Sequence, residues 1–307
     1  MNKDFLAVSD LSVYEFNRIL ELGSGVKAKP RRFRRALEGK ILAMIFEKPS
    51  LRTRMTFEVG MLQLGGEAVY LSPNDIQMGK RETPADIGRN LERWTDGIMI
   101  RTFAHAIAVE LAAAVRIPVI NALTDLLHPC QAMADFLTLK EKKGDLAALK
   151  LAYVGDGNNV CHSLINAAAK AGTKMAVAAP KGYEPSAAIV SAAREAGRET
   201  GFILDVVRDP AEAVSGADAV YTDVWASMGQ ESEKQKRARL FARYQVRAAL
   251  MAKAAPGALF MHCLPAHRGE EVASEVLDSP ASVVFDQAEN RLHVQKAIML
   301  ILMGKKF

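Results

Sequence analysis

Two hydroxyls and two guanidiniums lie within five residues of the chain, at Ser50, Arg52, Thr53 and Arg54, soon after the apolar run Ile41 to Phe46. A strand-to-helix junction offers free backbone N–H groups and the positive end of a helix dipole, and both attract an anion. Hydroxyl and guanidinium donors suit the oxygens of a phosphate. The segment therefore predicts an anion site at the start of a helix.

The alternative explanation is that Ser50 only caps this helix. Position 53 holds Thr, however, where a capping box would have Glu or Gln. Arg52 and Arg54 also occupy the first turn, where the helix dipole disfavours cations. A bound anion would compensate for this arrangement, so we favour the anion site over a cap alone.

A second group of hydrogen-bond donors follows later apolar runs. Arg101 ends the run Gly97 to Arg101, and His128 and Gln131 open a helix candidate. Taken singly, a strand-end Arg more often forms a surface ion pair, and a His before proline is more often a cap or a core residue. Taken together, the three can donate to a carbonyl or phosphate oxygen, which indicates the same anion site.

The turn from Gly155 to Asn159 follows the apolar run Leu151 to Val154 and is similar to the start of a dinucleotide fingerprint. Two parts of that fingerprint are missing. Val160 stands where a third small residue belongs, and the next strand, Met175 to Ala178, is not followed by an acidic residue. What remains is a glycine-rich turn that presents Asn159 at a helix start. It suits a small carboxylate, and it is equally well explained as an ordinary Asn-rich turn.

Two further candidates follow apolar runs in the second half of the chain. Asp223 precedes a glycine-containing loop with Ser227 and Met228, so it is at least as plausible a partner for an amine as a helix cap. Cys263 follows His262 at the end of an apolar run. A buried Cys is usually inert packing, but a thiol beside a His at a strand end indicates function.

Parallel strands must bring these side chains together. Apolar runs alternate with longer amphipathic stretches in two series, which is typical of parallel α/β sheets. The strand candidates are Ile41–Phe46, Ala68–Leu71, Gly97–Arg101 and Pro118–Ala122, then Leu151–Val154, Met175–Ala178, Ile203–Val207, Ala219–Val224, Ala258–His262 and Val283–Phe285. Helix candidates cover 53–64, 84–95, 105–115 and 289–303. We predict an α/β fold of two doubly wound parallel-sheet domains with the active site in the cleft between them, because ligands bind beyond the carboxyl ends of such strands.

Length and composition limit the class of protein. The chain has 307 residues, of which 50% are hydrophobic and 24% charged, which suits two globular domains and excludes disordered and disulfide-scaffold proteins. A net charge of +5 is too small to indicate a nucleic-acid partner but favours anionic small molecules. The three cysteines show no CxxC spacing, and no apolar run approaches a membrane span. We expect a cytoplasmic protein without nucleic-acid or membrane partners.

Three segments rich in charged residues complete the organisation of the chain. Lys140 to Gly144 is the expected domain boundary. The basic run Arg31 to Arg35 is expected to be a solvated helix face. Ser232 to Arg247, which is rich in Lys, Arg and Glu, is expected to be exposed.

Five motifs, in order along nearly the whole chain, resemble those of the ornithine carbamoyltransferases in the aspartate/ornithine carbamoyltransferase family. They are Ser-x-Arg-Thr-Arg from Ser50, His-Pro-Cys-Gln from His128, Asp-Val-Trp-x-Ser-Met-Gly from Asp223, His-Cys-Leu-Pro from His262 and Glu-Asn-Arg ending at Arg291. Aspartate carbamoyltransferases share the first motif. They lack the Ser-Met-Gly loop and have His-Pro-Leu-Pro in place of His-Cys-Leu-Pro.

The resemblance implies a division of labour between two domains. Residues 1–140, joined by the C-terminal helix 288–307, would bind carbamoyl phosphate, and residues 145–287 would bind L-ornithine. The implied reaction transfers the carbamoyl group to the side-chain amine of ornithine, giving L-citrulline and phosphate in arginine biosynthesis. A homotrimer that needs no metal and no cofactor is also implied.

The resemblance further implies a set of site residues. Those for carbamoyl phosphate are Ser50, Leu51, Arg52, Thr53, Gln77, Arg101, His128, Pro129, Cys130, Gln131, Cys263, Leu264 and Arg291, with Gln77 reaching into a neighbouring subunit's site. Those for ornithine are Asn159, Asp223, Ser227 and Met228. The catalytic residues would be Cys263, Asp223, Arg101 and His128. A cis bond before Pro265 is also implied.

The chain departs from the family's usual pattern at Leu51, where Thr is customary, so one hydroxyl donor is missing while the backbone N–H remains. Phosphate binding is expected to survive. Three alternatives stay open: a carbamoyltransferase for a related amine such as N-acetylornithine or putrescine, an NAD-dependent oxidoreductase that uses Gly155 to Asn159, and a two-domain binding protein for an anionic metabolite.

Overall fold

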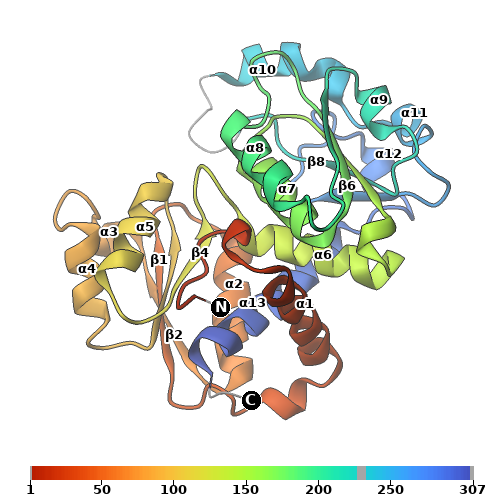
Figure 1. The fold of residues 1–307 in the computed structure, drawn as a ribbon. Coiled ribbons are helices and arrows are strands. Elements are labelled where there is room, and N and C mark those ends of the chain that lie inside the picture. The colour runs from red at the N-terminus through yellow and green to blue at the C-terminus, as the bar shows by residue number, and fades with distance from the viewer. Residues whose placement is uncertain (1, 227–232, 305–307) are drawn as a thin grey trace. The chain divides into compact units, whose positions relative to one another are not determined.

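The computed structural model describes residues 2–226 and 233–304. The chain divides into two compact units, which we call unit 1 (Met1–Leu137 and Glu289–Phe307) and unit 2 (Thr138–Ala288). Each unit contains one parallel β-sheet with helices packed against it (Figure 1). The prediction of two parallel-sheet α/β domains is therefore confirmed.

The sheet of unit 1 has the strand order β2-β1-β3-β4. Its strands are β1 (Ile41–Phe46), β2 (Glu67–Leu71), β3 (Gly97–Arg101) and β4 (Val119–Leu123). The helices that lie wholly or partly in this unit are α1 (Val13–Ala28), α2 (Leu51–Leu64), α3 (Pro73–Ile76), α4 (Pro84–Leu91), α5 (His105–Ala114), α6 (Pro129–Lys143) and α13 (Val284–Met303), with short 3₁₀ helices at Val8–Asp10 and Pro30–Phe33. All three strand pairings are parallel.

Alternation along β1 explains how helices come to cover both faces of this sheet. Ala43 and Ile45 are buried in one cluster with residues of α4 and α5, while the remaining side chains of a buried strand point to the opposite face. Figure 1 shows α4 and α5 on one side of the sheet and α2 and α13 on the other. Helices α2 and α13 pack together at Gly60, where an added Cβ would meet the flexible end of the Met299 side chain at 2.8 Å.

The sheet of unit 2 has the strand order β7-β6-β5-β8-β9, and it is parallel throughout. Its strands are β5 (Lys150–Val154), β6 (Lys174–Ala178), β7 (Leu204–Val207), β8 (Ala219–Thr222) and β9 (Leu259–His262). Its helices are α7 (Asn159–Ala171), α8 (Ala187–Ala196), α9 (Pro210–Val214), α10 (Lys234–Phe241), α11 (Ala248–Met251) and α12 (Ser274–Leu277), with 3₁₀ helices at Leu146–Ala148 and Ala242–Tyr244. Val154, Val220 and Phe260 of three strands share one core with Trp225 and Phe241.

The predicted strand Val283–Phe285 is wrong. From Val284 these residues form the start of helix α13, which therefore begins before the predicted position 289. A short apolar run does not distinguish a buried strand from a buried helix. The backbone pairing with β9 occurs just before the helix, where Ser282 bridges Phe260.

Lys140–Lys143 form the end of helix α6 and the two compact units divide after Leu137, and the domain boundary at Lys140–Gly144 stays a prediction. One charged segment differs from the expectation. Within the predicted exposed segment 232–247, helix α10 buries Arg237 and Phe241. The basic run is surface-exposed as expected, except for the buried Phe33.

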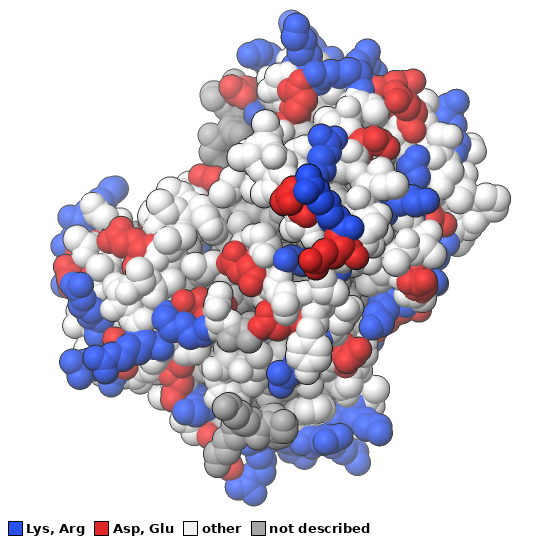
Figure 2. Space-filling view, viewed as in Figure 1, with Lys and Arg blue, Asp and Glu red and all other residues white. Residues whose placement is uncertain are grey.

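Basic and acidic side chains are interspersed on the face shown in Figure 2. This distribution agrees with a net charge of only +5. Among the described residues, none of the helices combines the length and the apolar character that crossing a bilayer requires.

Candidate active site

The polar residues predicted in the first half gather at one edge of the unit 1 sheet. Phe46 at the end of β1 pairs with Arg101 at the end of β3, and Arg101 pairs with Leu123 at the end of β4. The residues that follow these strands, from Ser50 and from His128, therefore start at the same edge. From β1 the chain adds β2 on one side of the sheet, and it then adds β3 and β4 on the other side. Open α/β sheets bind ligands at such a switch point, which here lies between β1 and β3.

Ser50 is the N-cap residue of α2, and its Oγ accepts a hydrogen bond from the Thr53 N–H at 3.2 Å. The capping role considered above is therefore real. It uses the hydroxyl only as an acceptor, so the hydroxyl hydrogen can still donate to an anion. Leu51 is the first residue of the helix and is 76% exposed. Arg54 stacks its guanidinium 4.0 Å from the Tyr70 ring centre and pairs with Glu58, so its charge is already engaged.

Arg291 connects three helices of unit 1 through buried hydrogen bonds. From α13 it donates to Gln131 Oε1 of α6 at 2.7 Å and to Thr53 Oγ1 of α2 at 3.3 Å. Gln131 in turn donates from Nε2 to Asp135 Oδ1 at 2.8 Å. The predicted site residues Thr53, Gln131 and Arg291 are thus brought together from distant parts of the sequence.

His128 is a buried imidazole surrounded by positive charge. Burial lowers its pKa well below the usual value, and the charges of Arg291, Arg101 and Arg52 lower it further. The ring is therefore neutral at neutral pH and carries one N–H that can donate. Three guanidiniums that act on one neutral donor form an electropositive site suited to an anion.

The remaining predicted residues of unit 1 take different positions. Pro129 and Cys130 are buried in the first turn of α6, and burial raises the pKa of Cys130 to about 12, which makes this thiol unreactive. Gln77 ends the short helix α3 in a left-handed conformation and is exposed. Its predicted role in a neighbouring subunit's site stays a prediction.

The candidates of unit 2 also meet at one sheet edge. Val154 of β5 pairs with Thr222 of β8, and Thr222 pairs with His262 of β9. Asp223 and Cys263 are therefore the next residues on adjacent strands. The turn with Asn159 follows β5, so these residues surround the second switch point, between β5 and β8.

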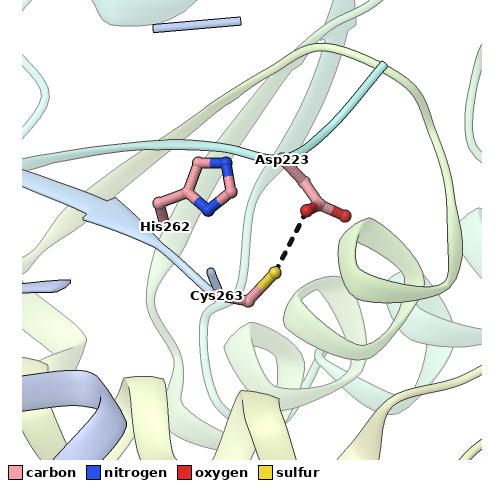
Figure 3. A group of neighbouring side chains, drawn as sticks. All are labelled: Asp223, His262 and Cys263. Carbon is pink, nitrogen blue, oxygen red and sulfur yellow. Dashed lines mark hydrogen bonds between the residues drawn. The ribbon is translucent and has the colours of Figure 1, made fainter. Parts of the chain in front are cut away.

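Asp223 has a defined partner on each carboxylate oxygen. The Cys263 thiol donates to Oδ1 at 3.0 Å, and Asn158 Nδ2 donates to Oδ2 at 2.7 Å. Figure 3 shows the Asp223 and Cys263 side chains pointing toward one another. Asp223 is 5% exposed and Cys263 is partly exposed, so the pair presents an anionic, hydrogen-bonding surface for an amine.

Asn158 is a site residue that sequence reasoning missed in favour of its neighbour Asn159. It is the N-cap of α7, with Oδ1 accepting from the N–H groups of Val160 and Cys161. Asn159 is the first residue of the helix and is partly buried. Asn158 could have been chosen from the sequence only if the first residue of α7 were known, and hydrophobic periodicity does not determine that residue. The predicted residues Ser227 and Met228 lie outside the described residues.

His262 shares a group of ligand-type atoms with Asp223 and Cys263, all within 4.8 Å of one another. Its ring nitrogens have other roles, however. Nδ1 accepts from the Leu264 N–H at 2.9 Å, so the hydrogen is on Nε2, which faces Glu271 Oε1 at 3.2 Å. Whichever nitrogen bound a metal would first have to give up its present contact. Its function here is to hold the backbone of Leu264, which has φ 58° and precedes a cis bond to Pro265, as the resemblance implies.

Gly157 makes room for the protein's own chain. A Cβ on Gly157 would lie 2.2 Å from the Pro185 nitrogen, and the Gly157 N–H donates to the Tyr183 carbonyl at 2.8 Å. In a dinucleotide site, the corresponding glycine lets the pyrophosphate approach the backbone. Here residues of the loop after β6 take that space, which argues against the NAD alternative.

Comparison with known proteins agrees with the groups of residues at each of the two sheet edges. Residues 3–141 match the profile of the aspartate/ornithine carbamoyltransferase carbamoyl-P binding domain, and residues 147–302 match that of the Asp/Orn binding domain. The chain belongs to the aspartate/ornithine carbamoyltransferase family. The sheet edge of unit 1 lies within the match to the carbamoyl-P binding domain, and that of unit 2 within the match to the Asp/Orn binding domain.

Relatives in the aspartate/ornithine carbamoyltransferase family match over almost the full chain. The ornithine carbamoyltransferase of Symbiobacterium thermophilum is 56% identical over 98% of this chain and 98% of its own. The anabolic ornithine carbamoyltransferase of Pyrococcus furiosus is 50% identical over 98% and 96%.

Solved structures of the family extend this similarity to the fold. The ornithine carbamoyltransferase structure from Pyrococcus furiosus has a TM-score of 0.96 at 49% identity, covering 99% of this chain and 98% of the other. The structure of the Thermus thermophilus enzyme has a TM-score of 0.89 at 46% identity and covers 99% of both chains.

Proposed function

We propose that this chain is an ornithine carbamoyltransferase, which transfers the carbamoyl group of carbamoyl phosphate to the side-chain amine of L-ornithine. The observation that carries the proposal is the buried guanidinium of Arg291, which donates to Thr53 at the start of α2 and to Gln131 at the start of α6. The Asp223–Cys263 pair at the other sheet edge supplies a separate surface for an amine. The names of the relatives point to the same reaction.

Unit 1 would bind carbamoyl phosphate. The phosphate dianion would lie at the N-terminus of α2, where Ser50, Arg52 and Thr53 supply donors in addition to the backbone N–H groups. Arg291 and Gln131 would complete its surroundings, with Leu51, Pro129 and Cys130 beside them. Leu51 has an exposed, apolar side chain. It would therefore contribute only its backbone N–H to phosphate binding.

Unit 2 would bind the amino-acid end of ornithine. Asp223 carries the negative charge that an α-ammonium requires, and Asn159 at the start of α7 can donate to the α-carboxylate. Ser227 and Met228 would complete this contact. Cys263, hydrogen-bonded to Asp223, would lie near the side-chain nitrogen, with Leu264 next to it.

The reaction has one bond formed and one broken at the same carbon. The neutral side-chain amine attacks the carbonyl carbon, the carbonyl oxygen gains negative charge, and the C–O bond to phosphate then breaks. The nitrogen loses a proton, which the departing phosphate would accept. Arg101 and the N–H of neutral His128 would stabilise the oxyanion, and one such donor is worth about 3 kcal/mol. Positioning of the two substrates accounts for much of the remaining rate enhancement.

A citrulline assay tests this proposal. Purified protein with carbamoyl phosphate should form citrulline from L-ornithine, and parallel reactions with putrescine, N-acetylornithine and L-aspartate should form little or no product. Asp223 is the reason for this expectation, since putrescine lacks an α-amino acid end, N-acetylornithine lacks the α-ammonium, and aspartate adds a carboxylate. If the protein carbamoylated any of these three amines faster than ornithine, that amine would be assigned as the substrate instead. Binding without turnover would favour a binding protein.

We also propose a homotrimer located in the cytoplasm. Unit 1 exposes apolar side chains along α2, namely Leu51, Met55 and Leu62, and Val69 on the edge strand β2 is 47% exposed. A subunit interface would remove this apolar surface from water. Cys130, Cys161 and Cys263 are free thiols, which suits a reducing compartment. Light scattering coupled to size-exclusion chromatography should give three times the 33.4 kDa chain mass.

A further inference from the structure

Arg237 is a buried guanidinium on helix α10 of unit 2, in a segment that the sequence predicts to be exposed. Its Nη1 donates to Asp156 Oδ2 at 2.6 Å and to the Trp225 carbonyl at 2.9 Å. Its Nε donates to Glu233 Oε2 at 2.9 Å, and its guanidinium carbon lies 4.8 Å from the Tyr183 ring centre. Only 6% of Arg237 is exposed, and its contact with Asp156 is largely shielded from water, whereas the Glu233 side chain is 47% exposed.

A buried ion pair is weak evidence for a stabilising role, because both charges lose their hydration. Burial raises the pKa of Asp156 in spite of the opposing effect of Arg237. What a planar guanidinium does supply is direction, since its donors hold several acceptors in one fixed geometry. The role of Arg237 then depends on what Asp156 and Trp225 position.

The first path from Arg237 to the candidate site runs through the turn after β5. The Asp156 carbonyl accepts from the Asn158 N–H at 2.7 Å and from the Tyr153 hydroxyl at 2.9 Å. The side-chain amide of Asn158 cannot turn over, because its Oδ1 accepts the first N–H groups of α7. Its Nδ2 is thereby directed at Asp223 Oδ2, 2.7 Å away. The Asp156 backbone therefore helps to hold the asparagine that donates to the Asp223 carboxylate.

The second path approaches Asp223 from its other side. Trp225, whose carbonyl Arg237 holds, follows Asp223 by two residues. The Trp225 ring stacks on Phe241 of the same helix α10, with ring centres 5.9 Å apart. One guanidinium therefore fixes both the residue that orients the Asp223 side chain and the backbone that follows it.

We infer that Arg237 and Asp156 are positioning residues for Asp223, and that they set the affinity of unit 2 for the α-amino acid end of its substrate. The inference rests on the proposed function for the identity of that substrate. Neither residue is placed in contact with a reacting atom. Their loss should therefore weaken amino-acid binding while carbamoyl phosphate binding and the chemical step change little.

The test compares Arg237→Gln with the matched control Arg239→Gln, an exposed arginine on the same helix. L-Norvaline, which has the amino-acid end of ornithine without the reacting amine, is titrated in the presence of carbamoyl phosphate. We expect Arg237→Gln to raise the Kd for norvaline about 10- to 100-fold, the effect of misplacing a hydrogen bond to a charged group. The Kd for carbamoyl phosphate and kcat at saturating ornithine should change less than about threefold.

Two further variants complete the comparison. Arg237→Lys keeps the charge but not the fork of donors, so the Kd for norvaline should lie between those of the wild type and Arg237→Gln. Asp156→Asn keeps the volume and should weaken norvaline binding in the same direction; it decides the matter if Arg237→Gln does not fold. An unchanged norvaline Kd in Asp156→Asn, or equal weakening of both ligands, would overturn the inference.

A second measurement does not depend on the substrate. The Asp223 carboxylate accepts the Cys263 hydrogen bond and repels a thiolate, so a displaced Asp223 should let iodoacetamide alkylate Cys263 at least about threefold faster in Arg237→Gln and Asp156→Asn. Cys130 and Cys161 are fully buried and leave Cys263 as the reactive thiol among the three. Altered alkylation in a protein that forms no citrulline would leave the positioning role intact and overturn the proposed function. Citrulline formation, with Cys263 alkylation and norvaline binding both unaltered in the variants, would support the proposed function and overturn the positioning role.

Discussion

The guanidinium of Arg291 is held by uncharged partners, the hydroxyl of Thr53 and the amide oxygen of Gln131. A carboxylate in either place would orient Arg291 equally well but would cancel its charge and compete with a bound anion. The neutral acceptors at these two positions fix the direction of the guanidinium without cancelling its charge. Asp135 joins this network through Gln131, whose Nε2 donates to Asp135 Oδ1 at 2.8 Å.

This arrangement predicts a specific effect of Thr53→Val, which keeps the shape of the side chain and removes its hydroxyl. Arg291 loses an acceptor and the proposed phosphate loses a donor. We expect the Kd for carbamoyl phosphate to rise about 10- to 100-fold in calorimetric titration, since a hydrogen bond to a charged group is worth about 1.5–3 kcal/mol. Thr56→Val on the same helix is the control, because Thr56 Oγ1 donates to the Arg52 carbonyl of its own helix. Equal effects of the two substitutions would contradict the assignment.

His128 predicts a pH dependence of stability in the protein without ligands. Its pKa is lowered by burial and by three arginines, so below pH 6.5 the unfolded chain binds a proton at this position that the folded protein does not. The free energy of unfolding should therefore fall as the pH drops below about 6.5, by up to about 1.4 kcal/mol per pH unit from this group. His105 and His293 also have lowered pKa values and act in the same direction. Urea unfolding of His128→Asn between pH 7.5 and 5 should show a smaller fall than the wild type, and an identical fall would exclude His128 as a cause.

At the scale of elements, sequence patterns located the buried strands well because each is a short apolar run between turn residues. The predicted bounds of β1 and β3 match the structure at both ends. The pattern failed at Val283–Phe285, where three apolar residues fit a helix as well as a strand. It also failed at Arg237, because burial of that charge depends on Asp156, 81 residues away in the sequence. The sequence also led to Asn159 instead of Asn158, because sequence patterns do not locate the first residue of a helix exactly and the cap is the residue before it.

Helix α2 predicts that one serine has two separable roles. Ser50 and Ser12 are both N-cap residues whose hydroxyls accept from the N–H three residues on, in α2 and α1 respectively. Replacing either by Ala should lower the free energy of unfolding by about 1 kcal/mol. Only Ser50→Ala should also weaken carbamoyl phosphate binding, because Ser50 lies at the proposed anion site and Ser12 does not. Urea unfolding and titration of both variants separate the roles, and unchanged affinity in Ser50→Ala would leave it as a cap alone.

At the scale of the whole molecule, the two units share one arrangement, in which polar residues follow the strands at the switch point of a parallel sheet. Each has a parallel sheet whose order reverses at a central pair, β1 with β3 in unit 1 and β5 with β8 in unit 2. The polar residues of unit 1 supply positive charge from Arg52, Arg101 and Arg291, and those of unit 2 supply the negative charge of Asp223. The net charge of +5 therefore says less about ligand preference than the placement of these few side chains.

This division predicts that each ligand protects its own unit against hydrogen exchange. Carbamoyl phosphate alone should slow backbone exchange in residues 50–56 and 128–133, where the first N–H groups of α2 and α6 lie. Addition of L-norvaline should further slow exchange in residues 155–162 and 262–266 of unit 2. At a ligand concentration of about 100 times the Kd, the stabilisation available is about 2.7 kcal/mol, enough for a clear change in exchange rates. Exchange by mass spectrometry would resolve these peptides. Protection of the unit 2 peptides by carbamoyl phosphate alone, with no change at the start of α2, would show that the substrates are assigned to the wrong units.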